Sequence, residues 1–171
     1  MKLLFPMLVV LVAASAARAQ QPVRRPLAYV SGTVAAQPIS YERVLLARAR
    51  LEVPAGARTR PWLEAGTWGF TGTTCMLGRV CGDHGALVGA GVDATPLGPA
   101  SPVQPFIGIG YEAYFAAGVK GRQDEALVHA GADTRLSRWA AFRAEAELLT
   151  FHRRGAPVLL SAGLRLSVPG R

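Results

Sequence analysis

The feature that most constrains the fold of this chain is an alternation of apolar and charged residues with a period of two. In the stretch 44–53 one face carries Arg48, Arg50 and Glu52, while every residue of the other face is Leu, Ala or Val. The stretch 139–151 repeats the pattern with other charges. Because successive side chains of a β-strand point to opposite faces, the alternation predicts strands with one charged and one apolar face.

Similar stretches follow one another along the chain, separated by Gly, Pro or charged turns, and no amphipathic helix pattern interrupts them. They predict eight strands, over 27–36, 44–53, 61–71, 86–95, 105–115, 126–136, 139–151 and 157–168. Each is close to the roughly 9–11 residues that a tilted strand needs to cross a bilayer. We therefore expect an all-β fold.

The beginning of the chain has a different pattern. A basic start and an apolar run over 3–14 precede Ala17-Arg18-Ala19, whose small residues fit the −3 and −1 positions of a cleavage site. This predicts a secretory signal peptide that is removed after export. The expected organisation is a signal peptide over 1–19, an N-terminal linker over 20–26 and a β-barrel domain over 27–168.

Composition narrows the choice of environment. Half of the residues are hydrophobic and 18% are charged, fewer than the roughly 25% usual in soluble domains. So large an apolar fraction excludes a disordered chain. The formal net charge is +8, but the arginines are spread along the chain, and an exported protein seldom meets nucleic acid. We therefore expect no nucleic-acid partner.

The residue types on the two faces predict which one points inward. Small residues and charges of both signs suit a narrow barrel interior, where charges must pair. The other faces hold Val, Leu, Ile, Ala and Phe and suit lipid, where a charge costs about 2–4 kcal/mol at mid-depth. The expected interior charges are Arg48, Arg50, Glu52, Glu64, Asp93, Glu112, Asp133, Arg135, Arg143, Glu145, Glu147 and Arg165.

These charges have two interpretations. One is a salt-bridge core that fills the barrel, which the narrow interior of an eight-stranded barrel favours. The other is a gated pathway for small solutes, lined by Arg48, Arg143, Arg165, Glu112, Glu145 and Glu147.

Aromatic residues raise two further alternatives. In 61–71, Trp62, Trp68 and Phe70 share a face with Glu64, which indicates either a bulge or an aromatic-lined interior. Aromatics near strand ends predict either a girdle at the membrane interface or ordinary core packing. They are Trp62, Phe70, Phe106, Phe115, Trp139 and Phe151.

The most typical of these stretches read PFIGIGYEAYF, RWAAFRAEAELLTF and PVLLSAGLRLSV. Over 27–168 the pattern resembles the small eight-stranded outer-membrane barrels of the OmpA/OmpX-like group. The resemblance implies an antiparallel up-and-down transmembrane β-barrel in the bacterial outer membrane, in contact with its lipid. The chain departs from the group at its end, where Ser167–Arg171 supplies no terminal aromatic residue.

The lengths of the connections indicate an orientation. If the N-terminus is periplasmic, the external loops are 37–43, 72–85, 116–125 and 152–156, and the internal turns are 54–60, 96–104 and 137–138. Both ends of the chain then lie on the periplasmic side, as an even number of strands requires.

Two cysteines lie in the longest predicted external loop. Cys75 and Cys81 are expected to form a disulfide, since export permits oxidation. A metal site with Asp83 and His84 is the weaker alternative, because five residues separate the cysteines and no second ligand cluster exists in the sequence. We expect no metal and no cofactor.

A catalytic role has little support in the sequence. The residues that a lipid-modifying hydrolase would use are His129, His152, Ser161 and Glu147, and no nucleophile motif accompanies them. Gly108-x-Gly110-x-x-Ala113 matches part of a dinucleotide fingerprint, but no helix pattern follows it, so glycines that make room inside a barrel explain it better.

The sequence therefore predicts a monomeric outer-membrane β-barrel with a structural or adhesive role, exercised on an extracellular partner through its loops, and with no catalysis. Two alternatives stay open. A soluble periplasmic lipocalin-like barrel would bind an apolar ligand and turn its apolar faces inward. A lipid-modifying outer-membrane enzyme would depend on His152.

Overall fold

A computed structural model describes residues 26–36, 44–70, 75–76, 80–81, 84–97, 101–117, 122–149 and 158–170 of the chain. The predicted signal peptide, Asp83, Phe151 and His152 lie outside these ranges. The strands are β1 (Pro26–Ala36), β2 (Val44–Glu52), β3 (Thr59–Phe70), β4 (Cys75–Met76), β5 (Val80–Cys81), β6 (His84–Ala94), β7 (Val103–Ala116), β8 (Arg122–Arg135), β9 (Ala140–Leu149) and β10 (Val158–Pro169).

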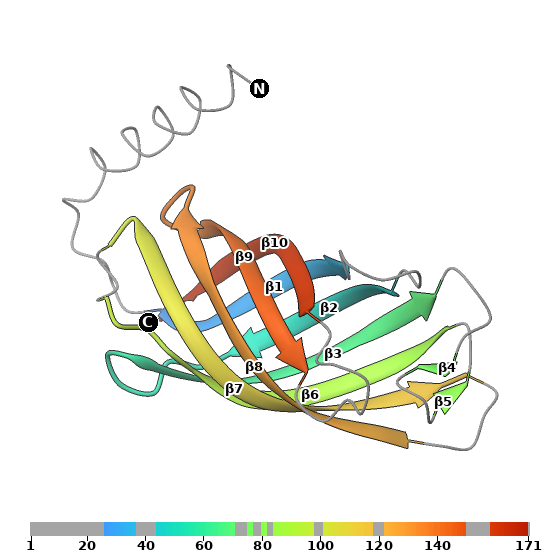
Figure 1. Cartoon of the computed structure of the whole chain (residues 1–171). Helices are drawn as coiled ribbons and strands as arrows, with labels where there is room; N and C mark the ends of the chain where they lie inside the picture. Colours follow the sequence, from blue (N-terminus) through green and yellow to red (C-terminus); the bar gives the residue numbers. More distant parts are fainter. Residues whose placement is uncertain are drawn as a thin grey trace.

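Eight of these strands close into one barrel in the order β1-β10-β9-β8-β7-β6-β3-β2, and every neighbouring pair is antiparallel (Figure 1). Consecutive strands are neighbours, apart from the short β4–β5 sheet inserted between β3 and β6. Closure gives every strand two partners, so no edge of unpaired backbone groups remains in the barrel. The predicted eight-stranded up-and-down barrel is confirmed.

The strand ends differ from the predicted ones by four residues at most. The largest shift is in β8, which begins at Arg122, whereas the alternation begins at residue 126. The four residues Arg122–Glu125 are all polar, so hydropathy gives no sign of a strand there. They pair with Glu112–Phe115 of β7, and backbone hydrogen bonding extends this hairpin beyond its apolar part.

The described residues of three short connections, namely 53–58, then 95–97 with 101–102, and finally 136–139, lie at the end of the barrel where β1 begins and β10 ends (Figure 1). In the first, Gly56 has a φ of 86°, a left-handed conformation that glycine adopts without strain. In the last, the Ser137 hydroxyl accepts hydrogen bonds from the backbone N–H groups of Trp139 and Ala140, both at 3.1 Å. We call this the turn end, and the opposite end the loop end.

The two faces of the strands differ as the alternation predicts. Along β2, buried and exposed residues alternate without exception. The large exposed apolar side chains of β7, β9 and β10 include Ile107, Ile109, Phe142, Leu160 and Leu164, and they point away from the interior. A lipocalin-like barrel requires the opposite arrangement. No helix among the described residues is long and apolar enough to span a membrane.

The aromatic residues are placed differently from a simple interface girdle. Trp62, Trp68 and Phe106 are buried in the barrel interior, whereas Phe115 and Trp139 are exposed. The pairing of β3 with both neighbours is continuous, so its inward tryptophans come from an aromatic-lined interior and not from a bulge. The girdle prediction is therefore wrong for Trp62 and Phe106; the Phe70 side chain and Phe151 lie outside the described part.

The β4–β5 hairpin places Cys75 directly opposite Cys81 in its backbone register. Directly paired residues of antiparallel strands have Cα atoms about 4.5–5.5 Å apart, within the usual span of a disulfide. The side chains of both cysteines lie outside the described part, and the disulfide stays a prediction.

The outward face generates a test. Ile109 lies near the middle of β7 and is 60% exposed, paired with Val92 and Val128. If this face contacts lipid, Ile109→Arg lowers the free energy of unfolding by about 2–4 kcal/mol. Urea titration of the barrel in phospholipid vesicles, followed by tryptophan fluorescence, measures this change. Ile109→Leu is the control and should cost less than about 1.5 kcal/mol; an arginine variant as stable as this control would contradict a lipid-facing surface.

Candidate functional site: the charged barrel interior

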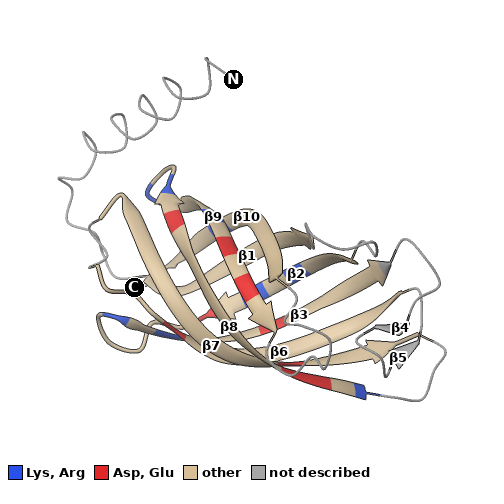
Figure 2. Cartoon of the chain, viewed as in Figure 1, with Lys and Arg blue, Asp and Glu red and all other residues tan. Residues whose placement is uncertain are grey.

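The structure buries eleven of the twelve charges that the sequence assigns to the interior, and these positions recur along the barrel strands (Figure 2). Arg135 is the twelfth and is half-buried near the turn end. The eleven come from seven of the barrel strands. They are Arg48, Arg50, Glu52, Glu64, Asp93, Glu112, Asp133, Arg143, Glu145, Glu147 and Arg165.

A middle layer of ion pairs is centred on Arg48 and Arg50 of β2. Arg48 donates from Nη1 to Oε2 of Glu147 at 2.7 Å and to Oε1 of Glu112 at 3.2 Å. Arg50 donates from Nε to Glu64 at 2.9 Å and from Nη1 to Glu145 at 3.4 Å. These two arginines thus join β2 to β3, β7 and β9. Because β7 and β9 are not neighbours of β2 in the barrel, the side chains that make these contacts cross the interior.

A second layer lies nearer the turn end and is centred on Asp133 of β8. Its carboxylate accepts hydrogen bonds from Arg60 at 3.0 Å, Arg143 at 2.8 Å and Arg165 at 2.8 Å. The carboxylate of Glu52 lies near the same three guanidinium groups, at 3.5, 2.5 and 3.3 Å respectively. Each arginine therefore has two carboxylate partners, which offsets the large cost of removing its charge from water.

Aromatic rings complete the environment of these arginines. Arg50 lies 4.3 Å from the centroid of the Trp62 ring, and Arg143 lies 4.5 Å from that of Phe106. Arg165 lies 3.4 Å from the centroid of the Tyr29 ring. Because the face of an aromatic ring attracts a cation, most strongly away from water, these contacts explain why large aromatics point inward beside charges.

His129 connects the two layers. Its Nε2 lies 3.0 Å from Asp93 and its Nδ1 lies 3.6 Å from Glu145. A Cβ atom at Gly108 would overlap both the His129 ring and the Asp93 carboxylate. Gly108 therefore provides the room for this contact, which is how the structure explains the glycine pattern of β7.

The loop end of the interior is largely apolar, although the buried pair of Gln123 and Glu125 also lies there. Tyr114 is fully buried there, and its hydroxyl donates to Glu112, which links this layer to the ion pairs below it. From the loop end to the turn end, the order is thus apolar side chains, the Arg48 layer and the Asp133 layer. The buried apolar cluster consists of Ala35, Val44, Leu46, Trp62, Trp68, Leu87, Tyr114, Ala116, Leu127, Leu149 and Leu159.

Sequence reasoning missed two buried charges and undervalued a third residue. The predicted turn 54–60 includes Arg60, although Arg60 lies on the same face of its strand as Trp62 and Glu64. Glu125 precedes the predicted start of its strand, and it receives a hydrogen bond from Gln123 at 2.5 Å. His129 has the parity of Asp133 and is buried with it, although it is absent from the predicted interior charges. If the alternation of these two strands is continued toward the N-terminus, Arg60 and Glu125 fall on the inward face.

The described candidate catalytic residues have other partners. The Ser161 hydroxyl donates to Glu145 at 3.0 Å, and Glu147 binds Arg48. The Nε2 of His129 faces Asp93. A hydrolytic nucleophile needs a base within hydrogen-bonding reach, and the hydrogen bond of Ser161 goes instead to a carboxylate that is already paired with Arg50. Among the described residues, no group of three potential ligands is placed to hold a metal.

Comparison with solved structures identifies proteins of the same fold. The N-terminal β-barrel domain of Pseudomonas aeruginosa OprF matches with a TM-score of 0.56 and 12% identity, covering 84% of this chain and 99% of that one. OprG from the same organism matches with a TM-score of 0.55 and 10% identity, covering 86% and 98%. Neisserial surface protein A matches with a TM-score of 0.53 and 14% identity, covering 81% and 93%.

The chain has the fold of small outer-membrane barrels. Neither a protein-family model nor a curated protein sequence matches it. The likeness therefore rests on architecture, and these identities are too low to transfer a function. The surface of the barrel agrees with the fold, because its exposed strand positions form the apolar exterior that a transmembrane barrel presents to lipid.

Asp133 offers a direct test of the network. Asp133→Asn removes the charge that three buried arginines share, and we expect it to lower the free energy of unfolding by about 3–5 kcal/mol. The matched control is Asp124→Asn, which breaks an exposed pair with Arg122 (side chains 42% and 53% exposed) and should leave the stability nearly unchanged. Urea unfolding in vesicles compares the two variants. Equal losses would show that the interior charges are solvated.

Proposed function

We propose that this chain is a monomeric bacterial outer-membrane barrel that has a structural or surface-interaction role and no catalysis. The exterior supports contact with lipid, because its exposed strand positions carry Val, Leu, Ile and aromatic side chains. Closure of the barrel supports the monomer, because all eight strands find their partners within one chain. In this proposal, the connections at the loop end bind an extracellular partner.

The side chains that fill the interior distinguish a salt-bridge core from a gated pathway for solutes. Among the described residues, a largely apolar layer that also holds the Gln123–Glu125 pair fills the loop end of the interior, and below it two layers of ion pairs cross the barrel. The six residues of the gated-pathway interpretation are all buried, and each pairs with a partner of opposite charge. This arrangement favours the salt-bridge core, which stabilises the barrel. It does not favour the pathway for solutes.

Labelling of intact cells tests the location and the orientation together. We expect an epitope inserted between residues 118 and 119, in the connection from β7 to β8, to bind antibody on intact cells. The same epitope inserted between Ser137 and Arg138, at the turn end, should bind only after permeabilisation. The protein should sediment with the outer membrane and shift in gel mobility only after heating. A soluble periplasmic protein without this shift, or labelling of the turn end alone, would overturn the proposal.

Conductance measurements test the plug. In a planar bilayer, we expect the purified barrel to give no sustained ion current, because paired side chains and the apolar layer fill its interior. A water-filled porin added to the same bilayer is the positive control. A sustained current that depends on the charge of Arg48 or Arg143 would instead support the gated pathway.

A further inference from the structure

The charges that the barrel exposes are distributed unequally between its two ends. Among the described residues, Asp124 is the one exposed acidic side chain, and it lies at the loop end. The other acidic side chains of the described part are buried. The three connections at the turn end contain Arg58 and Arg138 and no acidic residue. The charges exposed by these connections are therefore all positive.

The two turn arginines are available to an outside anion. Arg58 and Arg138 are both exposed, and within the described part of the chain neither guanidinium group has a carboxylate partner. Arg138 lies 5.0 Å from the centroid of the Trp139 ring, a contact that does not neutralise its charge. Figure 2 shows blue on both turns, at the tips of the β2–β3 and β8–β9 hairpins.

The two hairpins lie on opposite sides of the barrel. In the closed order, β1 and β10 separate them on one side, and β6 and β7 separate them on the other. One small anion cannot contact both turns across the width of the barrel. An anionic partner that reaches both must surround this end of the barrel, which is the position of the lipid around a transmembrane barrel.

Exposed apolar side chains continue as far as the turn end, beside the arginines. Leu136 and Trp139 flank the turn that carries Arg138, and both are exposed. A guanidinium group beside such residues can reach a lipid phosphate while its apolar neighbours stay in contact with acyl chains. The exposed apolar residues of this region are Leu27, Val53, Leu97, Leu136, Trp139 and Val168.

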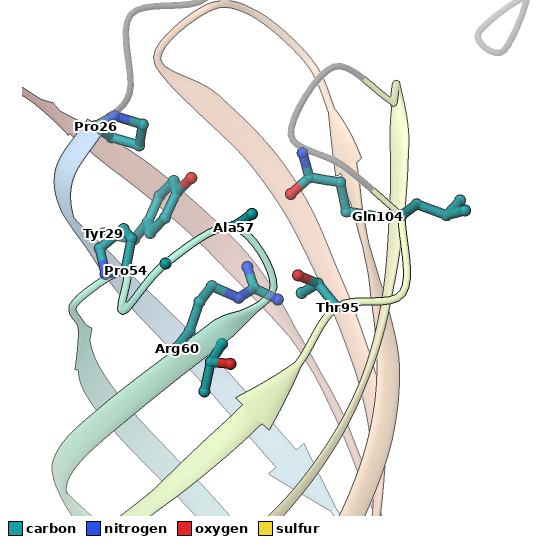
Figure 3. A pocket seen from close by; sticks show the side chains of 10 residues that line it. Pro26, Tyr29, Pro54, Ala57, Arg60, Thr95 and Gln104 are labelled. Carbon is teal, nitrogen blue, oxygen red and sulfur yellow. The ribbon is translucent and has the colours of Figure 1, made fainter.

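A pocket of about 60 Å³ also opens at the turn end, and we call it the turn-end pocket (Figure 3). The charged residue in its wall is Arg60, which is only 5% exposed and donates from Nη1 to Asp133 at 3.0 Å. The charge of Arg60 therefore belongs to the barrel interior. The pocket is lined by Pro26, Tyr29, Pro54, Gly56, Ala57, Thr59, Arg60, Thr95, Leu97 and Gln104.

We propose that Arg58 and Arg138 bind the phosphate groups of anionic phospholipids in the leaflet around the turn end. A guanidinium group binds phosphate oxygens through charged, often paired hydrogen bonds. Each arginine close to a membrane surface also gains from the negative charge of such lipids. The inference rests on the proposed function, because it requires a barrel in lipid, and it adds the class of lipid and the end of the barrel that binds it.

Spin-labelled lipids measure this preference directly. The full chain is folded into phosphatidylcholine vesicles, and the fraction of motionally restricted label is compared for phosphatidylglycerol and phosphatidylcholine that carry the same label. We expect the barrel to favour phosphatidylglycerol by roughly twofold or more at low salt. The preference should fall at high salt, because ions in solution screen attraction between exposed charges.

Two double variants assign the preference to the turn end. Arg58→Gln combined with Arg138→Gln removes both charges and should bring the association of the two lipids close to equal. Arg58→Lys combined with Arg138→Lys is the matched control, since it keeps both charges at the same positions and should keep most of the preference. Both positions are exposed, so we expect both variants to fold, and the heat-dependent shift in gel mobility checks this.

Equal association of the two lipids with the folded unmodified barrel would overturn the proposal, as would an undiminished preference in the glutamine variant. Soluble polyglutamate tests a different kind of anion. If it binds the barrel in phosphatidylcholine vesicles while the lipids show no preference, the partner is a soluble polymer and the lipid proposal fails. Each of these results would leave the outer-membrane proposal standing, whereas a chain that does not insert into vesicles would contradict that proposal itself.

Discussion

The pairing of buried charges is the constraint on which the rest of this structure depends. Five arginines and six carboxylates of the two ion-pair layers lie where water is largely excluded, and each would be very costly without a partner. Some pairs join neighbouring strands, but others, such as Arg48 with Glu112 and Glu147 or Asp133 with Arg60 and Arg165, join strands that are not neighbours in the barrel. The network therefore holds opposite walls of the barrel together. Its ion pairs form only when the barrel closes with each charged side chain in place.

The aromatic and glycine residues are explained by the same constraint. Trp62 and Phe106 turn inward because a ring face beside Arg50 or Arg143 replaces part of the hydration that a guanidinium group loses. Gly108 stays small because His129 needs the space to reach Asp93. The interior thus requires ion pairs, aromatic rings beside the arginines and room left by glycine, whereas the exterior requires only apolar side chains.

The turn end differs from the rest of the interior. Asp133 and Glu52 occupy one part of the Arg60 guanidinium group, and the other edge remains without a protein partner beside a pocket. Arg60 belongs both to the structural network and to the wall of the turn-end pocket, and its unpartnered Nε and Nη2 are themselves buried.

The alternation by itself determined that this chain forms eight strands, which face of each strand is charged and which residues point inward, because the two faces of a strand are separated by parity alone. It also led to the architecture, since charged interiors and apolar exteriors suit a barrel in lipid. Only the tertiary structure decided which charges meet, because Arg48 and Glu147, or Asp133 and Arg165, are brought together by closure and register. It also decided that Trp62 lies against Arg50 and Phe106 against Arg143, and that Nε and Nη2 of Arg60 have no protein partner, since these contacts depend on neighbours far away in the sequence.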